Sequence, residues 1–175
     1  KVKPIPFNPK KAIELLTAAG WKDSNKDGII DKEIDGKRVD FKFTLVFANK
    51  EFEKLWTILK EDMRKVGIEM NLKLMEFNSM LKIKDEYGFD AIALSWAGGS
   101  VDPDPKQIWH SSSAVKGGSN FVGYKNPEVD KLIDEARITA DRKKRVQLLQ
   151  KTYQVIAEDV PYLFMFSDRY SYYAT

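Results

Sequence analysis

The chain has 175 residues, no cysteine, and 29 basic against 26 acidic side chains, which gives a net charge of +3. This composition excludes disulfides and thiolate metal sites, and the interspersed charges argue against a nucleic-acid partner. The hydrophobic fraction of 43% indicates a globular chain with a sizeable core, and no apolar run approaches the roughly 20 residues of a membrane-spanning helix.

The first predicted element is a helix that begins at Asn8-Pro9 and stops at Gly20. Asn is a favoured N-cap, Pro a favoured first helical residue, and Gly a favoured stop. An apolar stripe at helical spacing runs between them: Ala12, Ile13, Leu16 and Ala19. Residues 21–36 are polar and rich in aspartate, and we expect a loop there.

Residues 41–74 predict a strand, a helix and a second strand. Apolar residues alternate over 41–47 and again over 68–74, which is the period of strands. Between them, apolar residues fall at helical spacing over 52–66, and Gly67 ends that helix. This order predicts parallel strands joined by a right-handed crossover.

Residues 89–110 are the most informative part of the chain. A short helix capped by Asn78 is expected before them. The nearly continuous apolar run over 89–94 predicts a strand buried on both faces, in the centre of a mixed or parallel sheet. The run breaks at Trp96-Ala97-Gly98-Gly99 and enters an Asp-Pro-Asp-Pro segment that cannot extend a strand. Because ligands bind at the carboxyl ends of strands in open α/β sheets, we expect a binding cleft here rather than a catalytic centre.

The rest of the chain predicts a long loop, two helices and a last strand. Residues 97–125 form the loop, with one helical turn near Lys106; a loop this long is usually functional. Asn126-Pro127 begins one helix and Asp141 caps another. Residues 162–166 are aromatic and apolar, and they predict a buried strand.

The polar segment before the first predicted strand fits part of a calcium-binding loop. Asp23, Asn25, Asp27 and Asp31 stand at positions 1, 3, 5 and 9 of that pattern, with Gly28 at position 6 for the sharp turn. Position 12, which normally carries a bidentate glutamate, is an isoleucine, and the glutamate stands one place earlier. Two interpretations stay open: a structural calcium site, or an Asx-rich turn with Gly28 in the left-handed conformation.

Asp102, Asp104 and His110 are the candidate catalytic side chains. Paired carboxylates can perform acid–base chemistry on glycosidic bonds, but loop carboxylates also bind backbone amides, and no other placed acid, base or nucleophile accompanies these two. A histidine followed by three serines is no triad signal, because triads are spatial. A lone histidine builds no zinc site without other ligands. We therefore interpret His110 as part of a polar loop.

Two of the tryptophans are candidates for a binding pocket. Trp96 and Trp109 lie in the loop region beyond a predicted strand end, and pockets favour aromatic side chains with a few placed polar groups. Phe52, Trp56 and Tyr153 lie at helical spacing instead, and we expect them in the core.

An ordered series of motifs covers nearly the whole chain. It comprises Asn8-Pro9 to Ala19-Gly20-Trp21, Asp23 to Gly28, Lys65-Val66-Gly67-Ile68, Phe89-Asp90-Ala91, Trp96, Asp102-Pro103-Asp104-Pro105, Trp109-His110-Ser111, Asn120-Phe121 through Tyr124 and Asp130 to Ile133, and Asp159-Val160-Pro161. The series resembles family 5 of the extracellular solute-binding proteins, the dipeptide, oligopeptide and nickel receptors of ABC importers.

The resemblance implies an α/β, class II periplasmic-binding-protein-like lobe with a mixed sheet flanked by helices. Residues 1–175 would form a single lobe, most of the C-terminal lobe of a bilobed receptor, without the N-terminal lobe and the final C-terminal segment. The ligand would lie between the lobes, which close by a hinge motion. The partners would be a small ligand of peptide type and a membrane permease. The full-length protein would be periplasmic or extracellular, and lipid-anchored or secreted.

The resemblance also implies which residues contact the ligand: Trp96, Ala97, Gly98, Gly99, Asp102 and Trp109. In peptide-binding members, the strand end offers main-chain hydrogen bonds to the peptide, and an aspartate three residues after the tryptophan pairs with its amino group. Gly99 occupies that place here, so this lobe is not expected to recognise an amino terminus in that way. A long peptide held by its backbone, an oligosaccharide or other small solute, and a substitute role for Asp102 remain open.

Two readings come from other classes of protein. One is a hydrolase that uses Asp102 and Asp104. The other is a calcium-dependent adhesion or scaffold module based on residues 23–31. The leading prediction is a non-enzymatic receptor that requires no cofactor.

Overall fold

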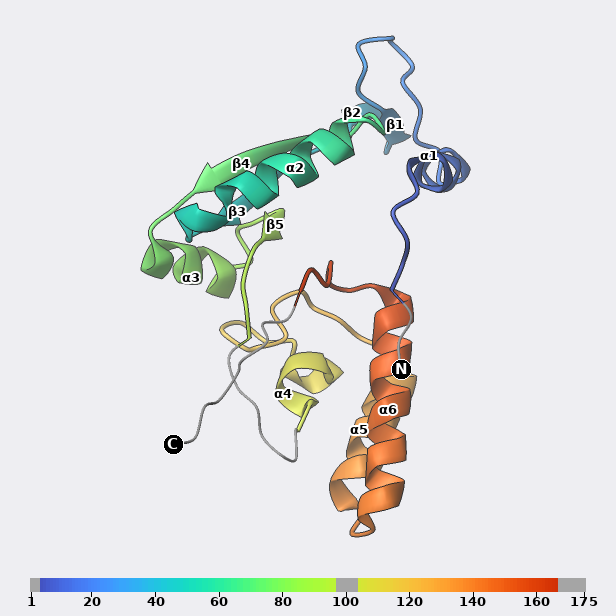
Figure 1. Ribbon diagram of the computed structural model, residues 1–175, viewed down its shortest axis with the longest axis vertical. Coiled ribbons are helices and arrows are strands. Elements are labelled where there is room, and N and C mark those ends of the chain that lie inside the picture. Colours follow the sequence, from blue (N-terminus) through green and yellow to red (C-terminus); the bar gives the residue numbers. More distant parts are fainter. Residues whose placement is uncertain (1–3, 97–103, 167–175) are drawn as a thin grey trace, which may run out of the picture. The chain divides into compact units, whose positions relative to one another are not determined.

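The computed structural model describes residues 4–96 and 104–166 (Figure 1). They group into two compact units, one within Pro4–Pro103 and the other from Asp104 onward. Each unit has its own secondary structure and its own buried side chains. The prediction that residues 1–175 form a single lobe stays a prediction.

The first unit opens with α1 (Pro9–Ala18), as predicted. The Asn8 side chain accepts a hydrogen bond from the Lys11 N–H at 3.0 Å, and Pro9 is the first helical residue. Gly20 follows the helix with φ +90°, a conformation that glycine adopts without a steric penalty. Within this chain the helix is peripheral, since Ile13 of its apolar stripe and the neighbouring Leu15 are exposed.

A β-hairpin replaces part of the loop predicted over residues 21–36. β1 (Asp31–Ile34) pairs in antiparallel register with β2 (Lys37–Asp40). The two turn residues, Asp35 and Gly36, have φ of 51° and 73°. Asp-Gly is a favoured pair for such a two-residue turn, because both positions require positive φ. The loop prediction was wrong here: charged residues occupy both strands and hide the alternation that marks a buried sheet.

The predicted strand–helix–strand unit is confirmed. β3 (Lys42–Phe47) and β4 (Glu69–Leu74) are parallel, and α2 (Glu53–Arg64) connects them after the short helix η1 (Lys50–Phe52). In Figure 1, α2 lies along β4. The buried side chains of the first unit include Leu45, Val46, Phe47, Ile68, Met70 and Met80.

Gly67 shows how closely the end of this crossover packs. Its φ is +81°, and a Cβ at this position would lie 2.7 Å from Cγ2 of Ile30. The Gly67 carbonyl accepts a hydrogen bond from the Ile30 N–H at 2.8 Å. Any side chain here would therefore push apart the segment before β1 and the segment before β4.

Two predictions after β4 were wrong in detail. The cap of α3 (Phe77–Asp85) is Glu76, whose carboxylate accepts the Ser79 N–H at 2.9 Å, whereas Asn78 lies inside the first turn. Residues 89–94 were predicted to form a strand buried on both faces. The observed strand is β5 (Ala91–Ile92), which is half-buried and lies at one edge of a sheet of order β4-β3-β5. The central strand is β3. An edge strand has one neighbour, so it buries less than the apolar run suggests.

The second unit is helical. It contains α4 (Lys106–Trp109), η2 (Ser111–Ser113), α5 (Pro127–Ile138) and α6 (Arg142–Asp159). Asn126 and Asp141 cap α5 and α6 as predicted. The helices α5 and α6 lie side by side (Figure 1), around a core of Trp109, Val129, Ile133 and Ile156.

The strand predicted over residues 162–166 is absent from the described part of the second unit. Residues 163–166 are exposed, with Phe164 at 56% and Phe166 at 59%. A strand requires a hydrogen-bonded neighbour, and no strand is present among residues 104–166. The apolar composition alone could not supply this partner.

The packing of α5 makes a direct prediction for stability. Ile133 is fully buried in the core of the second unit, so Ile133→Ala should lower the free energy of unfolding by about 2–5 kcal/mol through lost burial and a cavity. Ile138, the last residue of the same helix, is 85% exposed, so Ile138→Ala is the matched control, with an expected change under about 0.5 kcal/mol. Urea unfolding followed by circular dichroism measures both. Equal losses would contradict this assignment of the core.

Candidate functional site

The predicted binding segment begins where β5 leaves the sheet. The Ala93 N–H donates to the Val46 carbonyl at 2.9 Å, and the Asp90 carboxylate accepts the Thr44 N–H at 2.9 Å, so both ends of β5 are held against β3. Trp96 follows three residues after the last of these bonds and is 50% exposed. Ala97, Gly98, Gly99 and Asp102 lie outside the described residues.

Trp109, the second candidate pocket residue, is a core residue of the helical unit. It is only 6% exposed, and its ring centroid lies 4.6 Å from that of Tyr162 and 6.0 Å from that of Tyr124. This burial explains the aromatic side chain without a ligand. Trp96 and Trp109 belong to different units, and a shared role in one cleft stays a prediction.

Asp104, one of the two candidate catalytic carboxylates, has structural partners. One oxygen accepts the Lys106 N–H at 3.0 Å, which holds the start of α4. The other lies 3.0 Å from Nε of Arg137 on α5. These contacts are those of a loop carboxylate that binds backbone and a neighbouring helix. They favour the structural interpretation of Asp104 over general acid–base chemistry.

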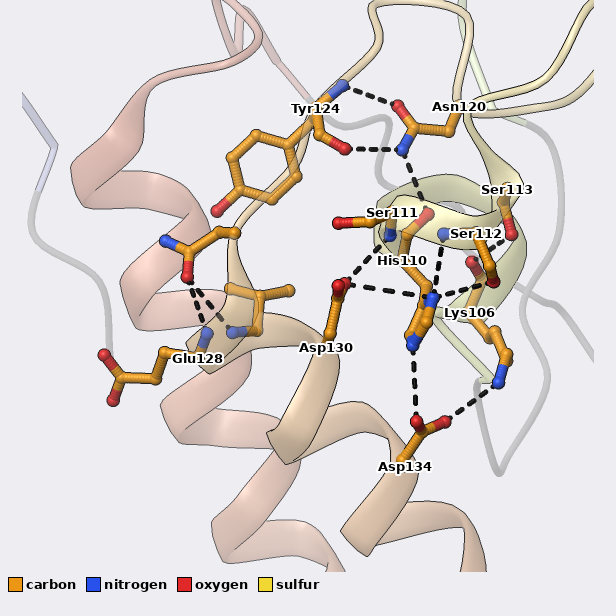
Figure 2. A network of polar contacts seen from close by, with 12 residues as sticks. Lys106, His110, Ser111, Ser112, Ser113, Asn120, Tyr124, Glu128, Asp130 and Asp134 are labelled. Atoms are coloured by element: carbon orange, nitrogen blue, oxygen red, sulfur yellow. Dashed lines mark hydrogen bonds and ion pairs between the residues drawn. The ribbon is translucent and has the colours of Figure 1, made fainter.

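Asn120 organises the loop between α4 and α5, as Figure 2 shows. The side chain is fully buried, and its amide donates to the carbonyls of His110 at 3.1 Å and Tyr124 at 2.8 Å. Its oxygen accepts the Tyr124 N–H at 2.9 Å. One side chain therefore satisfies three backbone groups and joins the two ends of the loop.

Asn120 belongs to the motif series in the sequence, but the series by itself predicts no role for it. Its position directly after Gly117-Gly118-Ser119 was the available signal. A short amide side chain in such a segment can take the place of missing backbone partners. Which backbone groups it reaches depends on the folded path of the loop.

His110 is held more firmly than the predicted polar loop implies. Its Nδ1 accepts the Ser112 N–H at 3.0 Å, and Ser112 Oγ lies 2.8 Å from the same nitrogen. Its Nε2 lies 3.3 Å from Asp134 Oδ2 on α5, and the other oxygen of Asp134 accepts from Lys106 Nζ at 2.8 Å. The hydrogen bond from Lys106, and after it that from His110, lowers the pKa of Asp134, which is therefore ionised at neutral pH.

A second polar cluster joins the two ends of the helical pair. The carboxylate of Asp159, at the end of α6, accepts from the Tyr124 hydroxyl at 2.5 Å and from the Asn126 amide at 2.7 Å. These two hydrogen bonds, with Tyr124 first, lower the pKa of Asp159. Burial first, and then the bond to Asp159, raises the pKa of the Tyr124 phenol. Because Asn126 also caps α5, Asp159 fixes the cap as well as the tyrosine.

The candidate calcium loop satisfies much of its own hydrogen bonding. Asp23 accepts from the Asp27 N–H at 3.2 Å and from the Gly28 N–H at 3.0 Å, and Gly28 has φ +90°, as the Asx-turn interpretation expects. The buried carboxylate of Asp31 accepts from the N–H of Ser24 at 2.9 Å and from its hydroxyl at 2.7 Å. The side-chain bond from Ser24 is the main cause that lowers the pKa of Asp31.

The remaining members of the candidate set bind each other and the backbone. Asn25 donates to Asp27 at 2.8 Å, and Asp27 accepts the Ile29 N–H at 2.9 Å. Within the described ranges, no three His, Cys, Asp or Glu side chains are grouped so that they could hold a metal ion. The hydrogen bonds fit the turn interpretation, and calcium binding by Asp23, Asn25, Asp27 and Asp31 stays a prediction.

Residues 1–118 match the family described as bacterial extracellular solute-binding proteins, family 5 Middle. The chain is 40% identical over 162 residues to the oligopeptide-binding protein AppA of Bacillus subtilis, which covers 91% of this chain and 29% of that protein. The chain thus spans less than a third of this relative's length.

Solved structures resemble the fold. The structure of AppA in complex with a nonapeptide has a TM-score of 0.83 at 40% identity, over 92% of this chain and 32% of that one. NikZ of Campylobacter jejuni in complex with Ni(L-His) has a TM-score of 0.78 at 29% identity, over 92% and 32%. An oligopeptide-binding protein of Thermotoga maritima with bound mannohexaose has a TM-score of 0.73 at 26% identity, over 89% and 30%.

The calcium hypothesis predicts a thermal effect. A cation that binds the folded loop and not the unfolded chain raises the melting temperature by mass action. Millimolar calcium should raise the melting temperature of the protein, and Asp27→Ala should abolish that rise. Magnesium at the same concentration is the control, since it demands a stricter octahedral geometry. An unchanged melting curve in calcium would exclude the calcium site and leave the Asx-rich turn as the interpretation of this loop.

The Asp159 cluster predicts a pH dependence. A carboxyl with a lowered folded-state pKa stabilises the protein above its unfolded pKa, near 3.9, and loses this contribution as the pH falls through the folded pKa. Asp159→Asn should therefore lower the melting temperature at pH 7 and flatten its decline between about pH 5 and 2. The control, Glu158→Gln, removes the same charge one residue earlier without touching Tyr124 or Asn126. If the melting temperature of Asp159→Asn declined with acid in the same way as that of the parent, Asp159 would not stabilise the fold through its lowered pKa.

Proposed function

This chain belongs to family 5 of the bacterial extracellular solute-binding proteins, as its motif series predicts, and we propose that the full-length protein is the substrate-binding receptor of an ABC importer. The observation that carries the proposal is the 40% identity to an oligopeptide-binding protein over nearly the whole chain. The α/β class predicted from the sequence agrees with the fold of that relative. The receptor would act without catalysis.

We propose a peptide as the ligand. The related structures hold a nonapeptide, a nickel–histidine complex and an oligosaccharide, so the fold alone does not select the ligand. Over the aligned residues, the relative with the nonapeptide is 40% identical to this chain, against 29% and 26% for the other two. This difference favours a long peptide, and an oligosaccharide is the alternative.

The proposed contacts are those that the family resemblance implies. Trp96 would form one wall of the cleft, and the backbone of Ala97, Gly98 and Gly99 would bond the peptide main chain. Asp102 and Trp109 would shape the cleft from the following loop. Trp96 is half exposed and lies just beyond the sheet, which supports a direct contact with the ligand. Trp109 is buried, so it would support the cleft wall without touching the ligand.

The partner of the loaded receptor would be a membrane permease, and the protein would act outside the cytoplasmic membrane, lipid-anchored or secreted. The family description supports an extracellular location. None of the helices within residues 4–96 and 104–166 is long and apolar enough to cross a bilayer.

Paired peptides test the mode of recognition. A nonapeptide and its N-acetylated form should bind the full-length protein with dissociation constants within about threefold, measured by calorimetry, because Gly99 offers no charge to an amino group. A buried amine that lost its ionic partner would instead weaken binding by a factor of thirty or more. Loss of binding on acetylation, reproduced by Asp102→Asn, would assign the amino group to Asp102.

Trp96→Ala should weaken peptide binding about tenfold or more, as truncation of an aromatic contact does. Phe77→Ala is the matched control, because Phe77 is also about half exposed but begins α3. If no peptide binds while an oligosaccharide binds tightly, the ligand proposed here is wrong and the receptor assignment stands.

A further inference from the structure

We propose that Ser112 is an activated nucleophile that accepts an acyl group from small activated aryl esters. Figure 2 shows the arrangement that suggests this: the Ser112 hydroxyl, the His110 imidazole and the Asp134 carboxylate follow one another. Ser112 Oγ lies 2.8 Å from His110 Nδ1, and His110 Nε2 lies 3.3 Å from Asp134 Oδ2. A hydroxyl, a base and a carboxylate that orients the base are the parts of a nucleophilic relay.

The backbone fixes the tautomer that such a relay requires. The N–H of Ser112 donates to His110 Nδ1 at 3.0 Å, so this nitrogen is an acceptor and the imidazole proton sits on Nε2. Nε2–H then faces the Asp134 carboxylate. Nδ1 has a single lone pair, which the Ser112 N–H and the Ser112 hydroxyl share, so Nδ1 is the atom positioned to take the hydroxyl proton as general base.

The charges around His110 maintain this arrangement. Asp134 faces the ring from α5 and is itself held by Lys106 of α4 at 2.8 Å. Asp130, one turn earlier on α5, lies 3.9 Å from Nδ1 and accepts the Ser111 N–H at 2.8 Å. Asp134 is a positioning residue, because it acts through His110.

Of three consecutive serines, the structure selects the middle one. The Ser113 hydroxyl donates to the Lys106 carbonyl at 2.9 Å, and Ser111 is held through its amide by Asp130. Ser112 is exposed, whereas the side chain of His110 is only 12% exposed. A small ester can therefore reach the Ser112 oxygen while the base behind it stays shielded.

The reaction balances without a cofactor. Ser112 Oγ attacks the ester carbonyl carbon and its proton passes to His110 Nδ1. The bond between that carbon and the phenolic oxygen then breaks, so the phenolate leaves and the acyl group stays on Ser112. The histidine then returns its proton to solvent. The next two amides of the loop are already used: the Ser113 N–H donates to the His110 carbonyl and the Ala114 N–H to the Ser111 carbonyl. Neither can stabilise an oxyanion, so we expect a single acylation rather than rapid turnover.

The experiment treats the full-length protein with p-nitrophenyl acetate and maps acetylation by tandem mass spectrometry. Trypsin cleavage after Lys106 and Lys116 places all three serines in one peptide, residues 107–116. Ser112 should acetylate at least about tenfold faster than Ser111 or Ser113, since a placed general base contributes on the order of a hundredfold or more. The two neighbours are internal controls for exposure and local sequence.

Variants separate activation from folding. Ser112→Ala should remove the preferred label, Ser113→Ala should keep it, and His110→Gln should reduce Ser112 to the rate of its neighbours. Asp134→Asn should slow labelling and Asp134→Glu should restore part of the rate, with circular dichroism confirming that each variant is folded. Equal labelling of the three serines in the parent, or undiminished labelling of Ser112 in folded His110→Gln, would overturn the proposal.

Discussion

The pairing of β3 with two parallel neighbours is the constraint on which the first unit depends. β3 is the central strand of its sheet, and Leu45, Val46 and Phe47 are buried although their side chains alternate between its two faces. A shift of one residue would exchange those faces, so the register with β4 and β5 is strongly specified. This register sets where β5 ends, and through it where Trp96 leaves the sheet. The candidate ligand-binding segment is thus positioned by the core packing of the neighbouring strand, β3.

The helical unit depends on polar contacts as well as on its core. The connection between η2 and α5 is long, and within residues 104–166 no strand supplies partners for its backbone groups. Asn120 joins the two ends of one connection, and Asp159 links the cap of α5 to the end of α6. These side chains place Tyr124 against Trp109 and hold His110 beside α5. The same contacts that close the loop create the serine–histidine–aspartate arrangement.

The chain carries the fold of its family and spans less than a third of the length of the related oligopeptide-binding protein. Related structures enclose peptides, metal complexes and sugars with the same architecture, because the sheet and helices supply a scaffold while the loops supply chemistry. Under the proposed function, specificity would depend on a few positions beyond the end of β5. Gly99 is the position at which the family resemblance predicts a difference, because a glycine offers no charge to a ligand.

The sequence by itself determined the elements whose signals are local. Three helices could be predicted from their caps at Asn8, Asn126 and Asp141. The parallel pair could be predicted from the alternation before and after α2, and the family from the ordered motifs. Each of these signals acts within a few residues along the chain, so tertiary structure was not needed to read it. The Asp35-Gly36 pair is also a local signal, for a hairpin turn. The hairpin was not predicted, because the charged residues of its strands do not show an apolar alternation.

Only the tertiary structure decided which apolar segments are buried and which polar side chains meet. The run at residues 89–94 became a two-residue edge strand, and residues 162–166 formed none, because a strand exists only where another strand offers its backbone. Asn120, Asp134 and Asp159 acquired their partners from residues 4 to 35 positions away. Such contacts have no period or spacing along the chain, since they follow from the packing of one helix against the next.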